Sequence, residues 1–214
     1  MKVLVLLSGG QDSATCLALA TVQFPGQVAA LCFDYQQRHR VEIERAKELA
    51  AIAEVPFEII ALPFISQLTE NALTRKDHKI DVSQGQLPTS FVEGRNLFFL
   101  SVAAVYAKQR QISSIYAGMC QTDYSGYPDC RYRFIESAAK TINLALDETI
   151  RIHTPLMWMT KAETVLLMQK CGKLDWYRYT HTCYEGQRPA CGQCPACQLR
   201  LKGFKEAGIA DPLE

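Results

Sequence analysis

Short apolar runs alternate along the chain with segments whose apolar positions recur at helical spacing. Most of these runs are almost continuously apolar, which is typical of strands buried on both faces of a parallel sheet. Regular alternation of strand and helix indicates βαβ units, whose right-handed crossovers place helices on both faces of the sheet. The predicted strands are residues 3–7, 28–33, 57–62, 113–118 and 150–153.

A helix-like segment follows the first predicted strand. Four further helices are predicted between and after the later strands. The earliest separates its apolar and charged positions onto two faces. The second is apolar almost all round, so we expect it to be deeply packed. The last opens with Thr160 and Glu163 in a capping-box pattern, which marks a helix start. The four predicted helices are residues 40–54, 95–109, 131–147 and 160–171.

These elements predict an α/β fold with a doubly wound, mainly parallel five-stranded sheet. Two stretches break the rhythm. Residues 66–94 are polar and irregular, and too long for a plain connection, so they are a candidate lid or substrate loop. The chain from residue 172 onward is rich in Cys, Pro, Gly and aromatic residues. We therefore expect an α/β domain over residues 1–171 and a small C-terminal appendage, residues 172–214, packed on it.

Length and charge narrow the function. A chain of 214 residues fits one domain with an appendage, and 23 basic against 22 acidic residues leave a net charge of +1. That balance offers no basic surface for nucleic acid, but it does not exclude a small anionic ligand. The N-terminal apolar run is too short for a signal peptide, and no run reaches the ~20 residues of a bilayer span. We expect a cytoplasmic protein with no nucleic-acid partner and no membrane partner.

The segment SGGQDS, residues 8–13, stands where the first strand should become a helix. Ligands of open α/β sheets bind at this edge, and glycines let backbone N–H groups approach an anion. The helix N-terminus and the hydroxyl groups of Ser8 and Ser13 add donors. No Walker lysine and no G-x-G-x-x-G fingerprint is present. A plain glycine turn is the structural alternative, but Asp12 with two serines favours a phosphate site.

Nine cysteines in a protein of a reducing compartment are more typical of metal ligands than of disulfides. Four of them are separated by seven, two and two residues, and four thiolates complete a tetrahedral shell at Zn²⁺. An iron–sulfur cluster and unligated thiols are the alternatives. A closed shell leaves no position for substrate, so we expect a structural role. The predicted zinc ligands are Cys183, Cys191, Cys194 and Cys197.

Two further segments carry polar side chains to the same edge of the sheet. Arg95 begins the second predicted helix, where its guanidinium would clamp a phosphate, although Asn96 there also reads as a plain helix cap. Residues 118–134 follow the fourth strand with carboxylates and aromatic rings suited to a planar heterocycle. The alternatives are a helix cap at Asp129 and packed tyrosines. The candidate substrate contacts are Asp123, Tyr124, Tyr127, Asp129 and Arg131.

SGGQDS resembles the SGGxDS loop of the ATP pyrophosphatases, which holds the β,γ-pyrophosphate while AMP is attached to a substrate oxygen. With FDYQQRH, GRNLFFLSVAAVYA, DYSGYPDCR, TPLMWMTKAET and the cysteine-rich tail, nearly the whole chain resembles the 7-cyano-7-deazaguanine synthase family of queuosine biosynthesis. Three segments depart from the usual pattern of that family. Gln36 replaces a glycine, Glu93 replaces a proline, and Tyr132 and Arg133 stand where an acidic residue is common.

The resemblance implies an ATP-dependent carbon–nitrogen ligase that converts 7-carboxy-7-deazaguanine and ammonia to the nitrile through adenylated carboxylate and amide intermediates. It implies ATP, a Mg²⁺ ion positioned by Asp12, one structural zinc per chain and a homodimer, with ammonia arriving free or from a partner. It also implies catalytic roles for Asp12, Ser13 and Arg95. The ATP-binding residues it implies are Leu7, Ser8, Gly9, Gly10, Gln11, Asp12, Ser13, Ala14, Thr15, Cys16 and Leu17.

Two other functions share parts of this pattern. A tRNA-thiolating enzyme of the same superfamily would adenylate a base and deliver sulfur. The balanced charge and the use of the clustered cysteines for zinc argue against it. A non-catalytic, zinc-stabilised nucleotide-binding module would not need the polar loop at residues 123–131.

Overall fold

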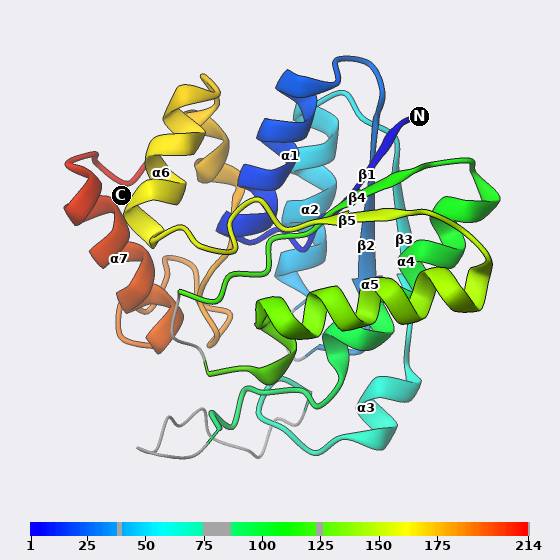
Figure 1. Cartoon of the computed structure of the whole chain (residues 1–214). Coiled ribbons are helices and arrows are strands. Elements are labelled where there is room, and N and C mark those ends of the chain that lie inside the picture. Colours follow the sequence, from blue (N-terminus) through cyan, green and yellow to red (C-terminus); the bar gives the residue numbers. More distant parts are fainter. Residues whose placement is uncertain (38–39, 75–86, 123–125, 214) are drawn as a thin grey trace.

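A single parallel sheet forms the centre of the molecule (Figure 1). The computed structural model describes residues 1–37, 40–74, 87–122 and 126–213. The strand order is β3-β2-β1-β4-β5, and every neighbouring pair is parallel. The five predicted strands and their parallel arrangement are therefore confirmed. The strands are β1 (Val3–Leu6), β2 (Val28–Asp34), β3 (Phe57–Ala61), β4 (Ser114–Tyr116) and β5 (Arg151–His153).

The strand order reverses between β1 and β4. The chain leaves β1 toward β2 and β3 on one side and returns on the other side to form β4 and β5. Leu4 of β1 lies in register with Ala29 of β2 and with Ile115 of β4. A reversal of this kind opens a crevice beyond the carboxyl ends of the strands, where ligands of α/β proteins bind. The loop after β1 begins at that crevice.

Helices cover both faces of the sheet (Figure 1). Three helices cover one face, and a fourth, α7, packs outside them against α6. Two helices, α4 and α5, cover the other face. On the first face lie α1 (Gln11–Gln23), α2 (Val41–Ile52) and α6 (Lys161–Lys170), with α7 (Pro195–Ala207) outside them; α4 (Arg95–Gln109) and α5 (Tyr132–Leu146) lie opposite. A short helix, α3 (Phe64–Leu68), follows β3.

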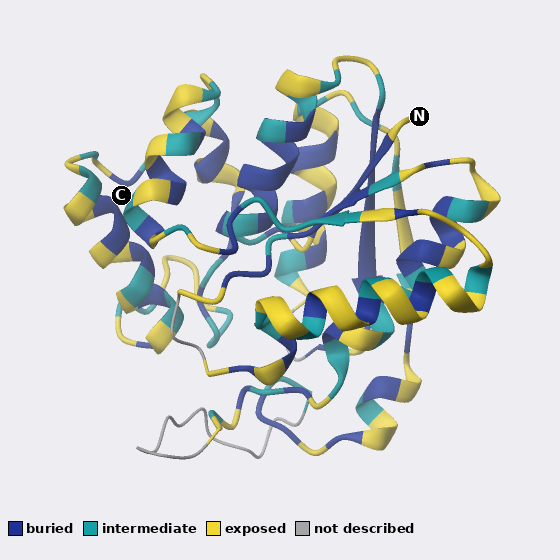
Figure 2. Cartoon of the chain, viewed as in Figure 1, coloured by how far each residue is buried: buried dark blue, intermediate teal, exposed yellow. Residues whose placement is uncertain are grey.

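The sheet separates two hydrophobic core clusters, and buried residues concentrate along the strands and the helix faces that contact them (Figure 2). Successive side chains of a strand point to opposite faces. Accordingly, Leu4 packs in the cluster under α4 and α5, whereas Val5 packs in the cluster under α1, α2 and α6. This is why the central strands carry no polar alternation. The edge strand β3 has one neighbour and is more exposed.

Two helix predictions have different outcomes. The capping box at α6 is confirmed: the backbone N–H of Glu163 donates to Thr160 Oγ1 at 3.2 Å, and that of Thr160 donates to Glu163 Oε2 at 2.7 Å. The expectation that residues 95–109 are deeply packed all round is wrong. Leu97 and Val105 of α4 are 43% and 49% exposed, because the sheet and α5 cover only one side of the helix.

The C-terminal segment shares a core with the rest of the chain. A 3₁₀ helix, η2 (Leu174–Tyr179), places Trp176 and Tyr177 in the same cluster as α1 and α6, and Phe204 of α7 joins them. The division between residues 171 and 172 stays a prediction. Residues 75–86 of the predicted lid lie outside the described residues. Among the helices that the structure describes, none is both long and apolar enough to cross a membrane.

Candidate active site

The turn between β1 and α1 forms a compact network of hydroxyl groups. It comprises residues 8–13 and is called the phosphate turn after its predicted role. Ser13 Oγ donates to the carbonyl oxygen of Gly10 at 3.0 Å and accepts from the backbone N–H of Ser8 at 3.2 Å. The two serine hydroxyl oxygens are 3.1 Å apart, and the backbone N–H of Gly10 donates to Ser8 Oγ at 3.3 Å. Gly10 caps α1, so the unpaired N–H groups of the first turn face the ligand side of the loop.

Gly9 is required by the packing of this turn. Its φ is +85°, and a Cβ atom at this position would lie 2.1 Å from the carbonyl oxygen of Glu42. Any side chain at Gly9 would therefore push the start of α2 away from the loop. From the other side, a Cβ on Gly118 would lie 3.1 Å from Asp12 Cβ. Glycines thus let α2 and the end of β4 close around the phosphate turn.

A lysine reaches the turn from a distant part of the sequence. Lys161, the first residue of α6, donates from Nζ to both carboxylate oxygens of Asp12 at 2.8 Å. The lysine is only 8% exposed, and both residues line the same cavity. The positive charge that a Walker loop carries next to its glycines is present here, but it comes from the helix that follows β5.

A cavity of about 340 Å³ extends from the phosphate turn across the ends of the strands. Leu7, Ser8 and Gly10 to Ser13 line it, whereas Ala14, Cys16 and Leu17 point into the core under α1. Gln11 is 4% exposed, and in the described part of the structure neither Nε2 nor Oε1 of its amide has a hydrogen-bond partner. A buried amide of this kind is costly unless a ligand or water completes it.

Arg95 and Glu42 both line the cavity, and the charge of Arg95 acts on the Glu42 carboxyl group. Arg95 Nη1 donates to the hydroxyl oxygen of Tyr35 at 3.4 Å, and its guanidinium lies about 6 Å from the ring centroids of Tyr35 and Phe99. Burial raises the pKa of Glu42 to about 7, although the positive charge of Arg95 opposes the shift. The cavity therefore holds a carboxyl group that titrates near neutral pH.

The predicted substrate residues fall into three groups. Tyr127 lines the cavity, and its hydroxyl lies 2.7 Å from Ser90 Oγ. Asp129 accepts the backbone N–H of Asn96 at 3.1 Å and so caps the start of α4. Arg131 donates to the carbonyl oxygen of Gly126 at 3.5 Å. Among the described residues, Asp129 and Arg131 are not part of the cavity lining. Asp123 and Tyr124 lie outside the described residues.

The three departures from the pattern of the resembled family, Gln36, Glu93 and Arg133, are not among the residues that line the cavity. Gln36 adopts a φ of +62°, a conformation that favours glycine. Its backbone N–H donates to Asp34 Oδ1 at 3.0 Å, and its side-chain oxygen accepts from Ser66 Oγ at 2.5 Å. Glu93 and Arg133 are exposed and lie outside the cavity lining. The altered positions therefore leave the phosphate turn unchanged.

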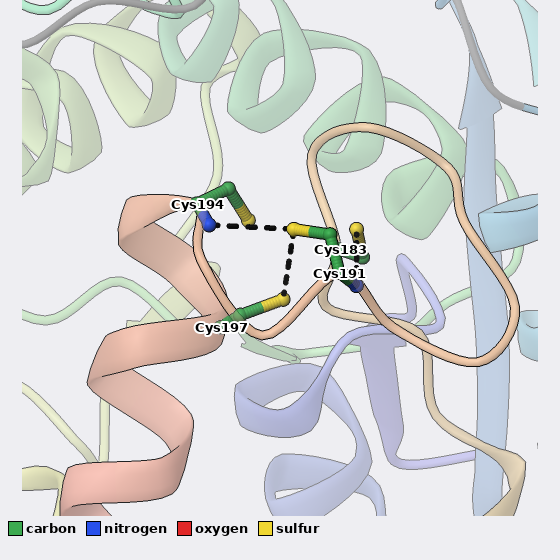
Figure 3. Close-up of side chains that lie close together, drawn as sticks. All are labelled: Cys183, Cys191, Cys194 and Cys197. Carbon is green, nitrogen blue, oxygen red and sulfur yellow. Dashed lines mark hydrogen bonds between the residues drawn. The ribbon is translucent and has the colours of Figure 1, made fainter.

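The four clustered cysteines come together in space (Figure 3). Their sulfur atoms all lie within 4.8 Å of one another, and Cys191 Sγ and Cys197 Sγ are 3.9 Å apart. Tetrahedral zinc with Zn–S bonds of about 2.3 Å places its sulfurs about 3.8 Å apart. Burial opposes ionisation of Cys191, but the backbone N–H groups of Cys194 and Gln193 donate to its sulfur and lower its pKa to about 7.

The cysteine segment forms one wall of the cavity. Residues 181–184 line it together with Ala196 and Leu199 of α7. The backbone N–H of His181 donates to the carbonyl oxygen of Gly9 at 2.9 Å, so this wall is hydrogen-bonded to the phosphate turn itself. Tyr177 adds a second link, because its hydroxyl lies 2.7 Å from Thr15 Oγ1 of α1.

The sequence did not predict that Lys161, His181 and Glu42 line the cavity. A signal for Lys161 was present, because a helix start after β5 lies at the same edge of the sheet as the phosphate turn. Glu42 belongs to a helix whose charged positions were expected to face solvent. His181 lies two residues before Cys183, the first of the four clustered cysteines, and carried no pattern of its own.

The strand order, the glycine turn at the reversal between β1 and β4, and the cavity beyond it define a doubly wound α/β protein with a ligand cavity at the carboxyl ends of its strands. Within that class the chain belongs to the family of the queuosine biosynthesis protein QueC, whose family model matches residues 2–208. The 7-cyano-7-deazaguanine synthase of Laribacter hongkongensis is 50% identical over 213 residues, covering 98% of this chain and 93% of the relative. That of Bacillus subtilis is 48% identical over 207 residues, covering 96% and 94%.

Solved structures support the fold at low sequence identity. NMN synthetase from Francisella tularensis aligns with a TM-score of 0.51 and 16% identity, covering 98% of this chain and 78% of the other. The U34-tRNA thiolase NcsA from Methanococcus maripaludis, solved with its [4Fe-4S] cluster, aligns with a TM-score of 0.52 and 14% identity, covering 97% and 67%. At these identities the likeness is one of fold.

Proposed function

We propose that the chain converts 7-carboxy-7-deazaguanine, ammonia and ATP to 7-cyano-7-deazaguanine. The observation that carries the proposal is a single cavity that joins a lysine-free phosphate turn to Arg95 and Tyr127. The chain that forms this cavity is 50% identical to a 7-cyano-7-deazaguanine synthase over nearly its whole length. The same similarity favours this reaction over tRNA thiolation and over a non-catalytic module.

The turn would hold the β,γ-pyrophosphate of ATP. The backbone N–H groups at the start of α1 and the hydroxyl groups of Ser8 and Ser13 supply neutral donors, and Lys161 supplies the positive charge. Gln11 would complete its buried amide on the ligand. Among the predicted ATP contacts, residues 7–13 other than Gly9 line the cavity, while residues 14–17 would support the turn from within α1.

Asp12 is the candidate ligand for Mg²⁺, because its carboxylate lines the cavity beside the phosphate turn and hard cations prefer oxygen ligands. When bound, the ion would neutralise phosphate charge at the leaving group. Lys161 already lies against both oxygens of this carboxylate, so the two positive charges would share Asp12 and the phosphates.

The reaction then proceeds in two adenylations. A substrate carboxylate oxygen attacks the α-phosphorus, and pyrophosphate leaves. Ammonia attacks the acyl carbon, AMP leaves with that oxygen, and one proton is lost. The resulting amide oxygen attacks the α-phosphorus of a second ATP, and pyrophosphate leaves again. Loss of the two remaining N–H protons expels the second AMP and forms the nitrile. Arg95 would hold negative charge near the reacting groups, and Tyr127 would stack on the deazaguanine ring.

The four clustered cysteines would hold one structural Zn²⁺. Their spacing fits a tetrahedral thiolate shell, and no ligand position is left for substrate. Such thiolates need a reducing compartment, which favours the cytoplasm. Metal analysis should give about one zinc per chain, and a coloured iron chromophore would contradict the assignment. The homodimer and the source of ammonia that the resemblance implies stay predictions.

The direct test incubates the protein with 7-carboxy-7-deazaguanine, ammonium and Mg-ATP and follows the products by chromatography and mass spectrometry. The proposal predicts the nitrile with two AMP and two pyrophosphate per turnover. Formation of ADP and inorganic phosphate would contradict adenylation. No deazaguanine turnover, together with robust thiolation of tRNA, would favour the other superfamily activity.

A further inference from the structure

Helix α7 contains a glycine where its helix would be more stable with alanine. Gly203 is buried in the interior of α7 (Pro195–Ala207), where glycine is less favourable than alanine. Its φ is not in the left-handed region, so backbone conformation does not explain it. The explanation lies in what it touches. A Cβ at Gly203 would lie 2.6 Å from Lys161 Cγ, 2.8 Å from Lys161 Cβ and 3.2 Å from its carbonyl carbon.

The contact acts on a side chain whose two ends are both held. The backbone of Lys161 is held at the start of α6 by the capping box of Thr160 and Glu163. Its Nζ is held between the two oxygens of Asp12. The backbone of Gly203 lies against the stem between these two points. Gly118 packs against the other member of the pair, since a Cβ there would lie 3.1 Å from Asp12 Cβ. The ion pair is therefore packed against two backbone segments that both lack a side chain.

Helix α7 is in turn anchored at the cysteine site. Cys194 is its N-cap and Cys197 lies in its first turn, six residues or about 9 Å of helix before Gly203. The buried Arg200 holds the middle of the helix, because its Nε and Nη2 donate to the two oxygens of Asp211 at 2.6 and 2.7 Å. Arg200 Nη1 also donates to Thr180 Oγ1 at 2.7 Å. The cysteine cluster, this arginine and direct packing against α6 together hold α7 in place.

We propose that Gly203 is a positioning residue, through which the cysteine-anchored helix α7 holds the Lys161 side chain at Asp12 in the phosphate turn. The inference rests on the proposed role of Lys161 in binding the phosphates of ATP. It gives the structural metal site a part in substrate binding: the cysteines fix α7, α7 fixes the lysine stem, and the stem places the ammonium group.

Gly203→Ala tests the proposal, with binding of Mg-ATP and of inorganic pyrophosphate to the whole protein measured by calorimetry. Loss of a charge-assisted contact weakens binding about 10- to 100-fold, and that is the expected effect on both ligands. Zinc content and the unfolding temperature should stay near the wild-type values. Lys202→Ala is the matched control, because Lys202 is the preceding residue and its side chain is 69% exposed. It should bind both ligands as the wild type does.

A double variant separates positioning from general damage. In a Lys161→Gly background, Gly203→Ala should weaken pyrophosphate binding by less than about twofold further, because both side-chain atoms that it displaces, Cβ and Cγ, are gone. Equal losses in both backgrounds would contradict the proposal, as would unchanged binding by Gly203→Ala alone. If Gly203→Ala yields no folded protein, recovery of folded, zinc-loaded Lys161→Gly/Gly203→Ala supports the contact, and failure to recover contradicts it. Absence of any ATP binding by the wild type would instead refute the proposed function.

Discussion

Lys161 and Asp12 form a bidentate ion pair at 2.8 Å although 149 residues separate them. The pair resolves the main irregularity of the sequence, a phosphate turn without a lysine. In a Walker loop the lysine follows the glycines and acts on the phosphoryl group that is transferred. Here the lysine arrives from the helix after β5 and shares a carboxylate with the turn. A positive charge in this place would stabilise pyrophosphate as the leaving group.

Replacing this lysine should therefore damage catalysis more than folding. Lys161→Met keeps the aliphatic stem and removes the charge, and we expect kcat/KM for ATP to fall by about 10²- to 10³-fold. Steady-state kinetics measured as AMP release would show it. Lys170→Met, at the exposed end of the same helix, is the control and should retain wild-type rates. Retention of full activity by Lys161→Met would remove the lysine from the mechanism.

Asp12→Ala should abolish turnover with the fold intact.

A cysteine ligand should behave differently from a residue of the phosphate turn. Cys194→Ser replaces one of the four proposed thiolate ligands by a hydroxyl group, so metal binding and the folding free energy it supplies should both fall. We expect less than half the wild-type zinc content and a lower yield of soluble protein. Cys171→Ser lies outside the cluster and should keep a full complement of zinc. Normal zinc content and solubility of Cys194→Ser would contradict the structural role.

Glu42 should make stability depend on pH. Its pKa is about 7 in the folded protein against 4.5 for an ordinary carboxyl group, so folding favours the protonated form. The contribution of Glu42 to the free energy of unfolding is therefore fully present below pH 4.5 and is lost as the pH rises through 7. Glu42→Gln removes this loss. We expect the variant to be more stable than the wild type by about 1–3 kcal/mol at pH 8 and nearly equal to it at pH 4.

Denaturant unfolding at several pH values would measure this difference. Glu44→Gln, in the same first turn but exposed, should show no pH-dependent gain. A constant difference between Glu42→Gln and the wild type across the pH range would mean that burial does not favour the protonated carboxyl group.

Gln36 should show an inverted preference between glycine and alanine. Both substitutions remove the side-chain hydrogen bond to Ser66. Because φ is +62°, alanine should pay the cost of the left-handed conformation and glycine should not. We expect Gln36→Gly to unfold with a free energy about 1 kcal/mol higher than that of Gln36→Ala. Equal stability, or greater stability of the alanine variant, would show that the turn relaxes to another conformation.

The parts of the fold that were predictable from sequence are those set by local pattern. Continuous apolar runs identified the strands, and Thr160 with Glu163 identified the start of α6 because a capping box needs only neighbouring residues. The exposed face of α4 was not predictable, since Leu97 and Val105 are apolar without being buried. Burial there depends on which side the sheet and α5 happen to cover.

The candidate site was predictable only where its residues are close in sequence. The SGGQDS segment and the four cysteines each indicate a predicted site through residues that are close together in the sequence. The Lys161–Asp12 pair and the hydrogen bond from His181 to Gly9 depend on how distant segments pack, and no spacing in the chain encodes them. Gly203 is similar, because its space is occupied by a side chain from another helix.

The central claim is that the substrate's own oxygen attacks the α-phosphorus in both adenylations. Labelling both carboxylate oxygens of 7-carboxy-7-deazaguanine with ¹⁸O and analysing the products by mass spectrometry tests it directly. The account predicts one ¹⁸O atom in each AMP, two AMP per nitrile, and unlabelled pyrophosphate. Label in inorganic phosphate, or AMP without label, would contradict it.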